Sequence, residues 1–163
     1  MKTTLCRSGT LLFVSFLLTA CGSRDEPAAT EPTPATAESA LDPIPGNTPA
    51  PESARVFFIT PQDGDIVPET FSVEFGIEGM AVVRAGDNSP NSGHHHLLID
   101  AELPDMTLPI PADANHVHFG DASTSTERTL PPGEHTLQLL FADYLHIPHK
   151  PPVYSDRITI TVQ

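Results

Sequence analysis

The chain has 163 residues, with 21 Asp and Glu side chains against 8 Lys and Arg, for a formal net charge of −13. This acidic balance argues against a nucleic-acid partner and against electrostatic adhesion to anionic lipid. Both cysteines, Cys6 and Cys21, precede the part of the chain that can fold. We therefore expect a domain that is held together by packing, without a disulfide.

Residues 1–20 have the three regions of a secretory signal peptide. A basic start is followed by the apolar run 11–18 and by small residues before Cys21. The run is too short to span a bilayer as a stable helix. The order Leu-Thr-Ala-Cys resembles the lipobox of bacterial lipoproteins, which implies cleavage before Cys21 and its acylation with fatty acids such as palmitate. We expect a lipid-anchored envelope protein, and Gly22 favours the outer membrane, facing the periplasm.

Residues 21–53 are interpreted as the acylated cysteine and a tether. Between Gly22 and Ser53 the sequence contains seven prolines and almost no large apolar side chain. Such a segment cannot bury enough surface to offset its chain entropy, so we predict that it is disordered. A proline-rich chain is extended, and this tether would hold the domain away from the membrane.

From Ala54 to Gln163, short apolar runs alternate with Gly and Pro turns, a pattern typical of strands. Residues 71–77 alternate strictly between apolar and other side chains, as a half-buried strand requires. The other expected strands are 55–59, 96–100, 124–130, 135–141 and 156–162. No segment shows the apolar stripe of a helix. The sequence predicts one all-β domain over residues 54–163, an immunoglobulin-like β-sandwich of about seven strands.

All eight histidines lie in this domain, and two pairs share one spacing. His94 and His96 are two residues apart at the start of a predicted strand, so they point to the same face while His95 points to the other. His116 and His118 repeat this spacing. Each pair can therefore present two imidazoles on one face of a strand.

A third pair, His146 and His149, lies in the connection before the last strand, where the loops of a sandwich converge. Together the three pairs could supply three or four neutral imidazoles to one point, as copper or zinc requires. The predicted metal ligands are His94, His96, His116, His118, His146 and His149. Four aspartates could donate oxygen ligands or orient the rings through hydrogen bonds: Asp100, Asp113, Asp121 and Asp143.

A structural polar network is the competing interpretation, because histidines also satisfy buried carbonyl groups. We favour it for His135, and we leave His95 out of the site because it faces away from its neighbours. In this reading the domain is a non-catalytic envelope scaffold that binds a partner protein. A third interpretation is a pH sensor, because crowded histidines titrate near neutral pH.

Four segments together resemble a bacterial domain family of small exported proteins whose function is unknown: Gly93–Asp100, Pro111–Gly120, Leu130–Leu139 and His146–His149. The resemblance runs from about Arg55 to the C-terminus. It implies a compact domain with a histidine-rich cluster, and it implies no particular activity, substrate or ligand.

Three common catalytic signatures are missing from the sequence. A Gly-x-Ser-x-Gly elbow, a Gly-rich phosphate loop and a His-Glu-x-x-His motif are all absent. Catalysis by an open metal site stays a hypothesis, although a small sandwich has little room for a deep substrate pocket. The leading hypothesis is a lipoprotein that stores, delivers or sequesters copper or zinc. The two His-x-His pairs would form the site, and His146 and His149 would complete or gate it.

Overall fold

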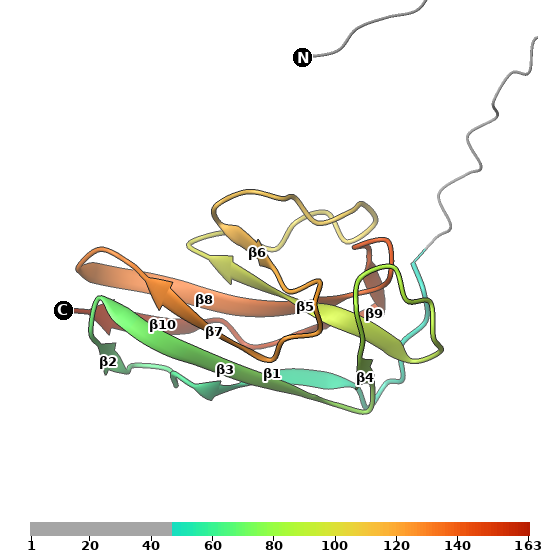
Figure 1. The fold of residues 1–163 in the computed structure, drawn as a ribbon, viewed down its shortest axis with the longest axis horizontal. Helices are drawn as coiled ribbons and strands as arrows, with labels where there is room; N and C mark the ends of the chain where they lie inside the picture. Colours follow the sequence, from blue (N-terminus) through green and yellow to red (C-terminus); the bar gives the residue numbers. More distant parts are fainter. Residues whose placement is uncertain (1–46) are drawn as a thin grey trace, which may run out of the picture. The chain divides into compact units, whose positions relative to one another are not determined.

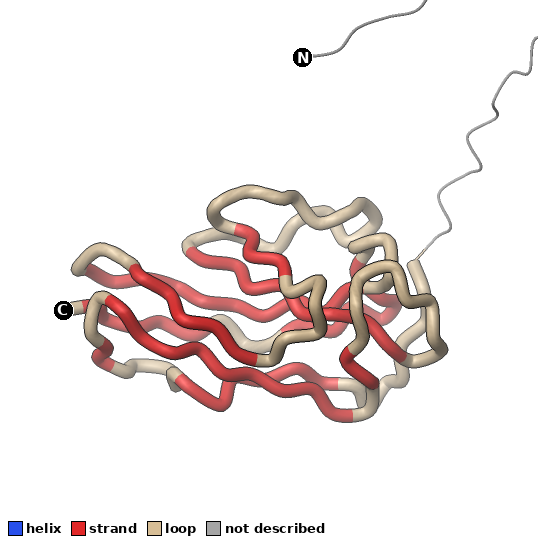
Figure 2. Tube along the Cα trace, in the orientation of Figure 1, coloured by secondary structure: helices blue, strands red, loops and turns tan. Residues whose placement is uncertain are grey.

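The computed structural model describes residues 47–163, whose regular secondary structure consists of β-strands (Figures 1 and 2). Within this range there is no helix, and hence none with the length and apolar character needed to cross a membrane. The predicted signal peptide, Cys21 and most of the predicted tether lie outside the described residues.

Ten strands form two sheets. The strands are β1 (Arg55–Thr60), β2 (Ile66–Val67), β3 (Thr70–Glu78), β4 (Ala81–Val82), β5 (Ser92–Ile99), β6 (His116–His118), β7 (Ser125–Thr129), β8 (Gly133–Ala142), β9 (Pro148–Tyr154) and β10 (Ile158–Val162). The smaller sheet has the order β1-β3-β7. The larger has the order β2-β10-β8-β5-β4, with β6 paired to β5 and β9 paired to β8.

The two sheets pack face to face around one apolar core. In β3 the side chains alternate between exposed and buried, with Phe71, Val73 and Phe75 directed inward. They pack with inward side chains of the larger sheet such as Leu97 and Leu139. The predicted all-β sandwich is confirmed, with ten strands in place of about seven.

Strand β5 is buried on both faces, and every one of its residues is shielded from solvent. Leu97 and Ile99 belong to the core between the sheets, whereas Leu98 packs in a second apolar cluster with Leu140 and Ile110. The connection between β5 and β6 lies over this outer face, as Figure 1 shows. Any polar side chain on the outer face of β5 is therefore withdrawn from bulk water.

The strands that the sequence pattern did not predict are short or rich in proline. β2 and β4 have two residues each and β6 has three, too few to show an alternation. β9 contains Pro148, Pro151 and Pro152, a composition that argues against a central strand because proline donates no ladder hydrogen bond.

The folded part of the chain begins before Ala54. The side-chain amide of Asn47 donates a hydrogen bond of 2.7 Å to the backbone oxygen of Pro148. The backbone N–H of Ala50 donates one of 3.1 Å to the oxygen of Lys150. Residues 47–53, which composition assigned to the tether, therefore pack against β9.

Candidate metal centre

His94 and His96 lie on the outer face of strand β5, and both side chains are buried there. They are 0% and 1% exposed and lie opposite Ala142 and Leu140 of β8. The alternation expected for a His-x-His pair is present, because successive side chains of a strand point to opposite faces. The two rings are neighbours, with centroids 4.9 Å apart.

His95 lies between them in sequence but on the inner face. Its ring packs edge-on against Phe75 and Phe141, at centroid distances of 4.7 and 4.9 Å. Burial lowers the pKa of His95 to about 4, so the ring is neutral at pH 7. The expectation that His95 faces away from the other histidines agrees with this placement.

Strand β6 brings His118 opposite His96. The backbone N–H of Phe119 donates a hydrogen bond of 3.1 Å to the backbone oxygen of His95. His96 and His118, the next pair along the two strands, therefore form a non-hydrogen-bonded pair. Side chains approach more closely in such pairs. The ring of His118 also lies over Gly120, where an added Cβ would stand 2.8 Å from Nε2.

A tight turn between β8 and β9 presents His146. The buried carboxylate of Asp143 accepts hydrogen bonds from the N–H groups of Leu145 and Ile147 at 2.9 and 3.0 Å. The N–H of His146 donates to the backbone oxygen of Asp143 at 2.9 Å, and φ of His146 is 66°. Left-handed backbone at a residue with a side chain is strained and is often found at functional sites.

The four imidazoles of His94, His96, His118 and His146 meet in one group, which we call the histidine cluster. Their six centroid separations are 4.9, 4.9, 4.9, 5.1, 6.0 and 4.7 Å. Ring nitrogens of His94, His96 and His118 lie within 4.8 Å of one another. Three nitrogens therefore converge, and no nitrogen of His146 belongs to this group. The ring of His146 lies beside it, with its centroid 4.9, 6.0 and 4.7 Å from those of His94, His96 and His118.

The spacing of the rings suits four ligands at the corners of a tetrahedron. A zinc–nitrogen bond of about 2.0 Å puts an imidazole centroid about 3.1 Å from the metal, and four tetrahedral rings then stand about 5.1 Å apart. In a square site two of the six separations would be about 6.2 Å and four about 4.4 Å. Five of the six separations lie between 4.7 and 5.1 Å, so the arrangement is nearer to a tetrahedron.

Burial and mutual repulsion keep the inner rings of the cluster neutral. Desolvation lowers the pKa of His94 to about 3, with smaller contributions from the positive forms of His146 and His118. Desolvation and the neighbouring imidazoles lower the pKa of His96 to about 2, and burial also lowers the pKa of His118. Neutral imidazole is the form that binds a metal ion.

Two of the six predicted ligands lie outside the cluster. Nδ1 of His116 is 2.8 Å from a carboxylate oxygen of Asp113, so this ring is tied to its own turn. Nδ1 of His149 is 2.8 Å from the hydroxyl of Thr48, and its ring stacks on Phe141. Both rings have other neighbours, although His116 repeats with His118 the two-residue spacing of His94 and His96.

His135 has the structural role expected of it. Its Nδ1 is 2.7 Å from a carboxylate oxygen of Asp100, and its Nε2 is 2.9 Å from the backbone oxygen of Pro131. The hydrogen bond with Asp100 raises the pKa of His135. This histidine therefore fastens the start of β8 to the end of β5.

The four aspartates build turns rather than join the cluster. Asp100 and Asp113 hold His135 and His116, and Asp121 accepts a hydrogen bond from the N–H of Ser123 at 3.0 Å. Asp143 shapes the turn that carries His146. The role of Asp143 in shaping this turn and the position of Gly120 beneath His118 were not predicted from the sequence. An Asp three residues before a turn histidine is nevertheless a recognisable turn signal.

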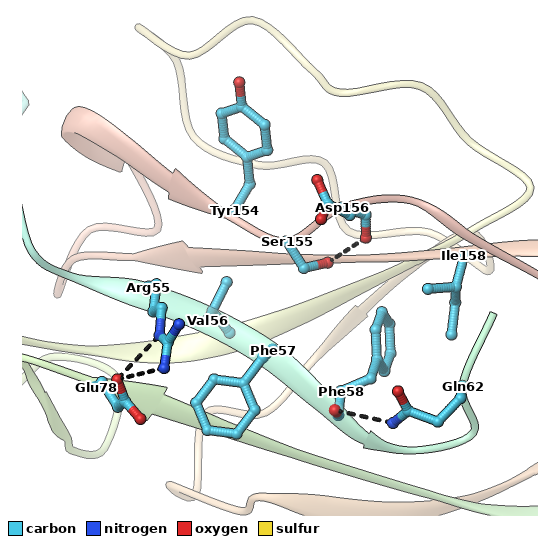
Figure 3. A pocket seen from close by; sticks show the side chains of 10 residues that line it. All are labelled: Arg55, Val56, Phe57, Phe58, Gln62, Glu78, Tyr154, Ser155, Asp156 and Ile158. Atoms are coloured by element: carbon cyan, nitrogen blue, oxygen red, sulfur yellow. Dashed lines mark hydrogen bonds and ion pairs between the residues drawn. The ribbon is translucent and has the colours of Figure 1, made fainter.

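A separate cavity of 480 Å³ opens between β1 and the end of β9. Figure 3 shows Arg55 paired there with Glu78, and their nitrogen and oxygen atoms are 2.8 Å apart. No histidine lines this cavity, and the ion pair is largely exposed and contributes little to stability. It offers no group of converging ligands comparable to the histidine cluster.

Residues 73–163 match the family model described as Domain of unknown function (DUF4399). The match begins within β3 and includes every histidine of the chain. No curated protein and no solved structure matches the chain. The expected resemblance to a domain family of unknown function is confirmed, and the chain belongs to the DUF4399 family.

Proposed function

We propose that this protein is a lipid-anchored lipoprotein of the bacterial envelope whose domain binds one zinc or copper ion. His94, His96 and His118 are the ligands, and His146 is the fourth. The protein would store, deliver or sequester the metal. This set keeps four of the six residues predicted from the sequence.

The state of His94 is the observation that carries the proposal. Its side chain is fully buried, and three other imidazoles stand 4.9 Å from its ring. Neither of its ring nitrogens has a hydrogen-bond partner among residues 47–163. Leaving a buried polar group without a partner costs about 1–3 kcal/mol. A metal ion bound by the cluster would be the partner of one of the two nitrogens.

The ligand chemistry narrows the choice of metal. Imidazole nitrogen binds zinc and copper well, and neither thiolate nor carboxylate joins the cluster in the described residues. The near-tetrahedral spacing suits zinc or monovalent copper better than divalent copper, which prefers square geometry. The candidate metals are therefore divalent zinc and monovalent copper.

A structural polar network explains the histidines outside the histidine cluster better than those within it. His116, His135 and His149 each have an oxygen within hydrogen-bond distance, whereas His94 has none. If the domain were instead a scaffold for an envelope protein, pull-down of that partner would persist in excess chelator. A metal carrier would lose its metal-dependent partners under the same conditions.

The membrane anchor is proposed from the sequence alone. The lipobox-like order before Cys21 supports acylation, and Gly22 supports sorting to the outer membrane. Growth with labelled palmitate should label the wild-type protein in the membrane fraction and leave Cys21→Ala unlabelled. Equal labelling of both proteins would contradict the anchor and leave the metal site unaffected.

The metal site is tested by elemental analysis and calorimetric titration of the lipid-free mature chain. We expect one equivalent of zinc or copper, and His118→Ala should weaken its binding at least about 100-fold. His135→Ala is the matched control, because His135 lies outside the cluster, and it should retain the wild-type affinity. Binding weaker than about 10 μM, or roughly 7 kcal/mol, in the wild type would contradict the proposal.

A further inference from the structure

The rings of the histidine cluster differ in their access to solvent. His94 and His96 are buried on β5, which is flanked by β6 and β8. His118 is exposed, and β6 pairs with no described strand besides β5. His118 also lines an open hollow of 590 Å³. A molecule in this hollow would approach the cluster from the side of His118.

His118 is held less firmly than the neighbouring histidine of its strand. The ring of His116 is fixed by the carboxylate of Asp113, whereas the ring of His118 makes no hydrogen bond within residues 47–163. The residue beneath it is Gly120, which presents only backbone to the ring. Rotation of the His118 side chain toward solvent therefore breaks no hydrogen bond.

We propose that metal enters and leaves this site by ligand exchange at His118. This inference rests on the proposed function. An acceptor molecule occupies the hollow, its donor atom forms a bond to the metal, and the bond from the His118 nitrogen to the metal breaks. The electron pair of the His118 bond returns to the imidazole, and the metal keeps its oxidation state. His94, His96 and His146 hold the metal until further donor atoms of the acceptor replace them one by one and carry the metal away.

The lining of the hollow indicates the class of acceptor. Besides His118, its polar lining consists of the guanidinium of Arg128, the carboxylate of Asp121 and the hydroxyl-bearing residues Ser123, Ser125 and Thr126. A guanidinium recognises carboxylate oxygens with two parallel hydrogen bonds. Arg128 is therefore the group of the hollow that would receive a carboxylate-bearing chelate, whose oxygen or nitrogen replaces His118 on the metal.

The test measures how fast the protein gives up its metal and how that rate depends on the acceptor. The lipid-free mature chain is loaded with Co²⁺, whose visible absorption reports four-coordinate binding, and is mixed with nitrilotriacetate in a stopped-flow instrument. The rate of transfer should rise linearly with nitrilotriacetate concentration. If the metal instead dissociated first, the rate would not depend on the acceptor.

A substitution that fills the hollow sharpens the test. Ser125→Trp should slow transfer about tenfold, or about 1.4 kcal/mol in activation free energy, with unchanged Co²⁺ affinity. Thr129→Trp is the matched control, because Thr129 is exposed on the same strand and does not line the hollow. It should transfer metal at the wild-type rate.

The outcomes separate this inference from the proposed function. A chain that binds no Co²⁺, zinc or copper contradicts both. A chain that binds metal but releases it at a rate independent of nitrilotriacetate overturns only the exchange at His118. The concentration dependence is measured on the wild-type chain, so the test does not depend on the folding of any variant.

Discussion

The two faces of strand β5 bury the same type of side chain in different surroundings. On the inner face, His95 packs between the rings of Phe75 and Phe141. On the outer face, His94 packs against three other imidazoles. Neither His94 nor His95 has a hydrogen-bond partner in the described part of the chain, and burial lowers both pKa values. Burial therefore sets the charge of a histidine, while the neighbouring side chains decide what its ring can bind.

The largest expected effect is shared by both faces and appears as acid sensitivity of the metal-free domain. The folded-state pKa values of His94, His95 and His96 lie below the unfolded value near 6.5. The unfolded chain therefore binds more protons as pH falls below 6.5, and stability decreases. Each ring contributes up to about 1.4 kcal/mol per pH unit.

Urea unfolding at pH 7 and pH 5, with chelator present, measures this loss. We expect the three rings together to remove up to about 6 kcal/mol of unfolding free energy over this interval. The loss should continue below pH 5, toward the folded pKa of about 4 for His95 and about 3 for His94. A thermal midpoint that stays flat from pH 8 to pH 5 would contradict it and would also remove the pH-sensor interpretation.

The second prediction separates the two faces. Zinc or copper at 100 times its Kd should stabilise the wild-type domain by about 2.7 kcal/mol. His94→Leu should abolish this metal-dependent gain. His95→Leu should keep the gain and stabilise the metal-free domain by about 1 kcal/mol, because it replaces an unpartnered buried imidazole by an apolar group.

Thermal unfolding with and without metal compares these two variants directly. They are a matched pair, since both replace a fully buried histidine of β5 by leucine. If both variants lost the metal response, or both kept it, the proposed division of roles between the faces would be wrong.

The smallest expected effect concerns a histidine that belongs to neither face. The pKa of His135 is raised by its hydrogen bond with Asp100. Its contribution is therefore fully present below pH 6.5 and is lost as pH rises through its folded pKa, opposite in sign to that of His95. Because the Asp100 side chain is 41% exposed, we expect less than about 1 kcal/mol.

The variant His135→Gln measures the contribution of the His135–Asp100 hydrogen bond to the free energy of unfolding. Its destabilisation, from urea unfolding, should be larger at pH 6 than at pH 9, and metal binding should be unchanged. The ring of His135 should also titrate above 6.5 in an NMR experiment. A ring that titrates below that value would contradict the assignment.

The sequence predicted most of the fold where the side-chain pattern is long enough to read. Alternation located β3, β8 and β10 within a few residues. It missed β9, because three prolines in seven residues look like a loop, and β6, because three residues show no period. The predicted start of β5 at His96 was four residues late, because β5 begins at Ser92. A run of polar histidines resembles a turn, and the sequence pattern does not show that the connection between β5 and β6 buries them.

The two-residue period of a strand is local, and it was enough to predict which histidines share a face: His94 and His96 lie together, with His95 opposite. Which of the rings meet depends on how the strands and turns pack. The register of β6 brings His118 to His96, the turn at Asp143 adds His146, and Asp113 holds the ring of His116 away from the cluster. These contacts join residues far apart in the chain, and their geometry depends on strand register and on the covering of the outer face, which no local pattern encodes.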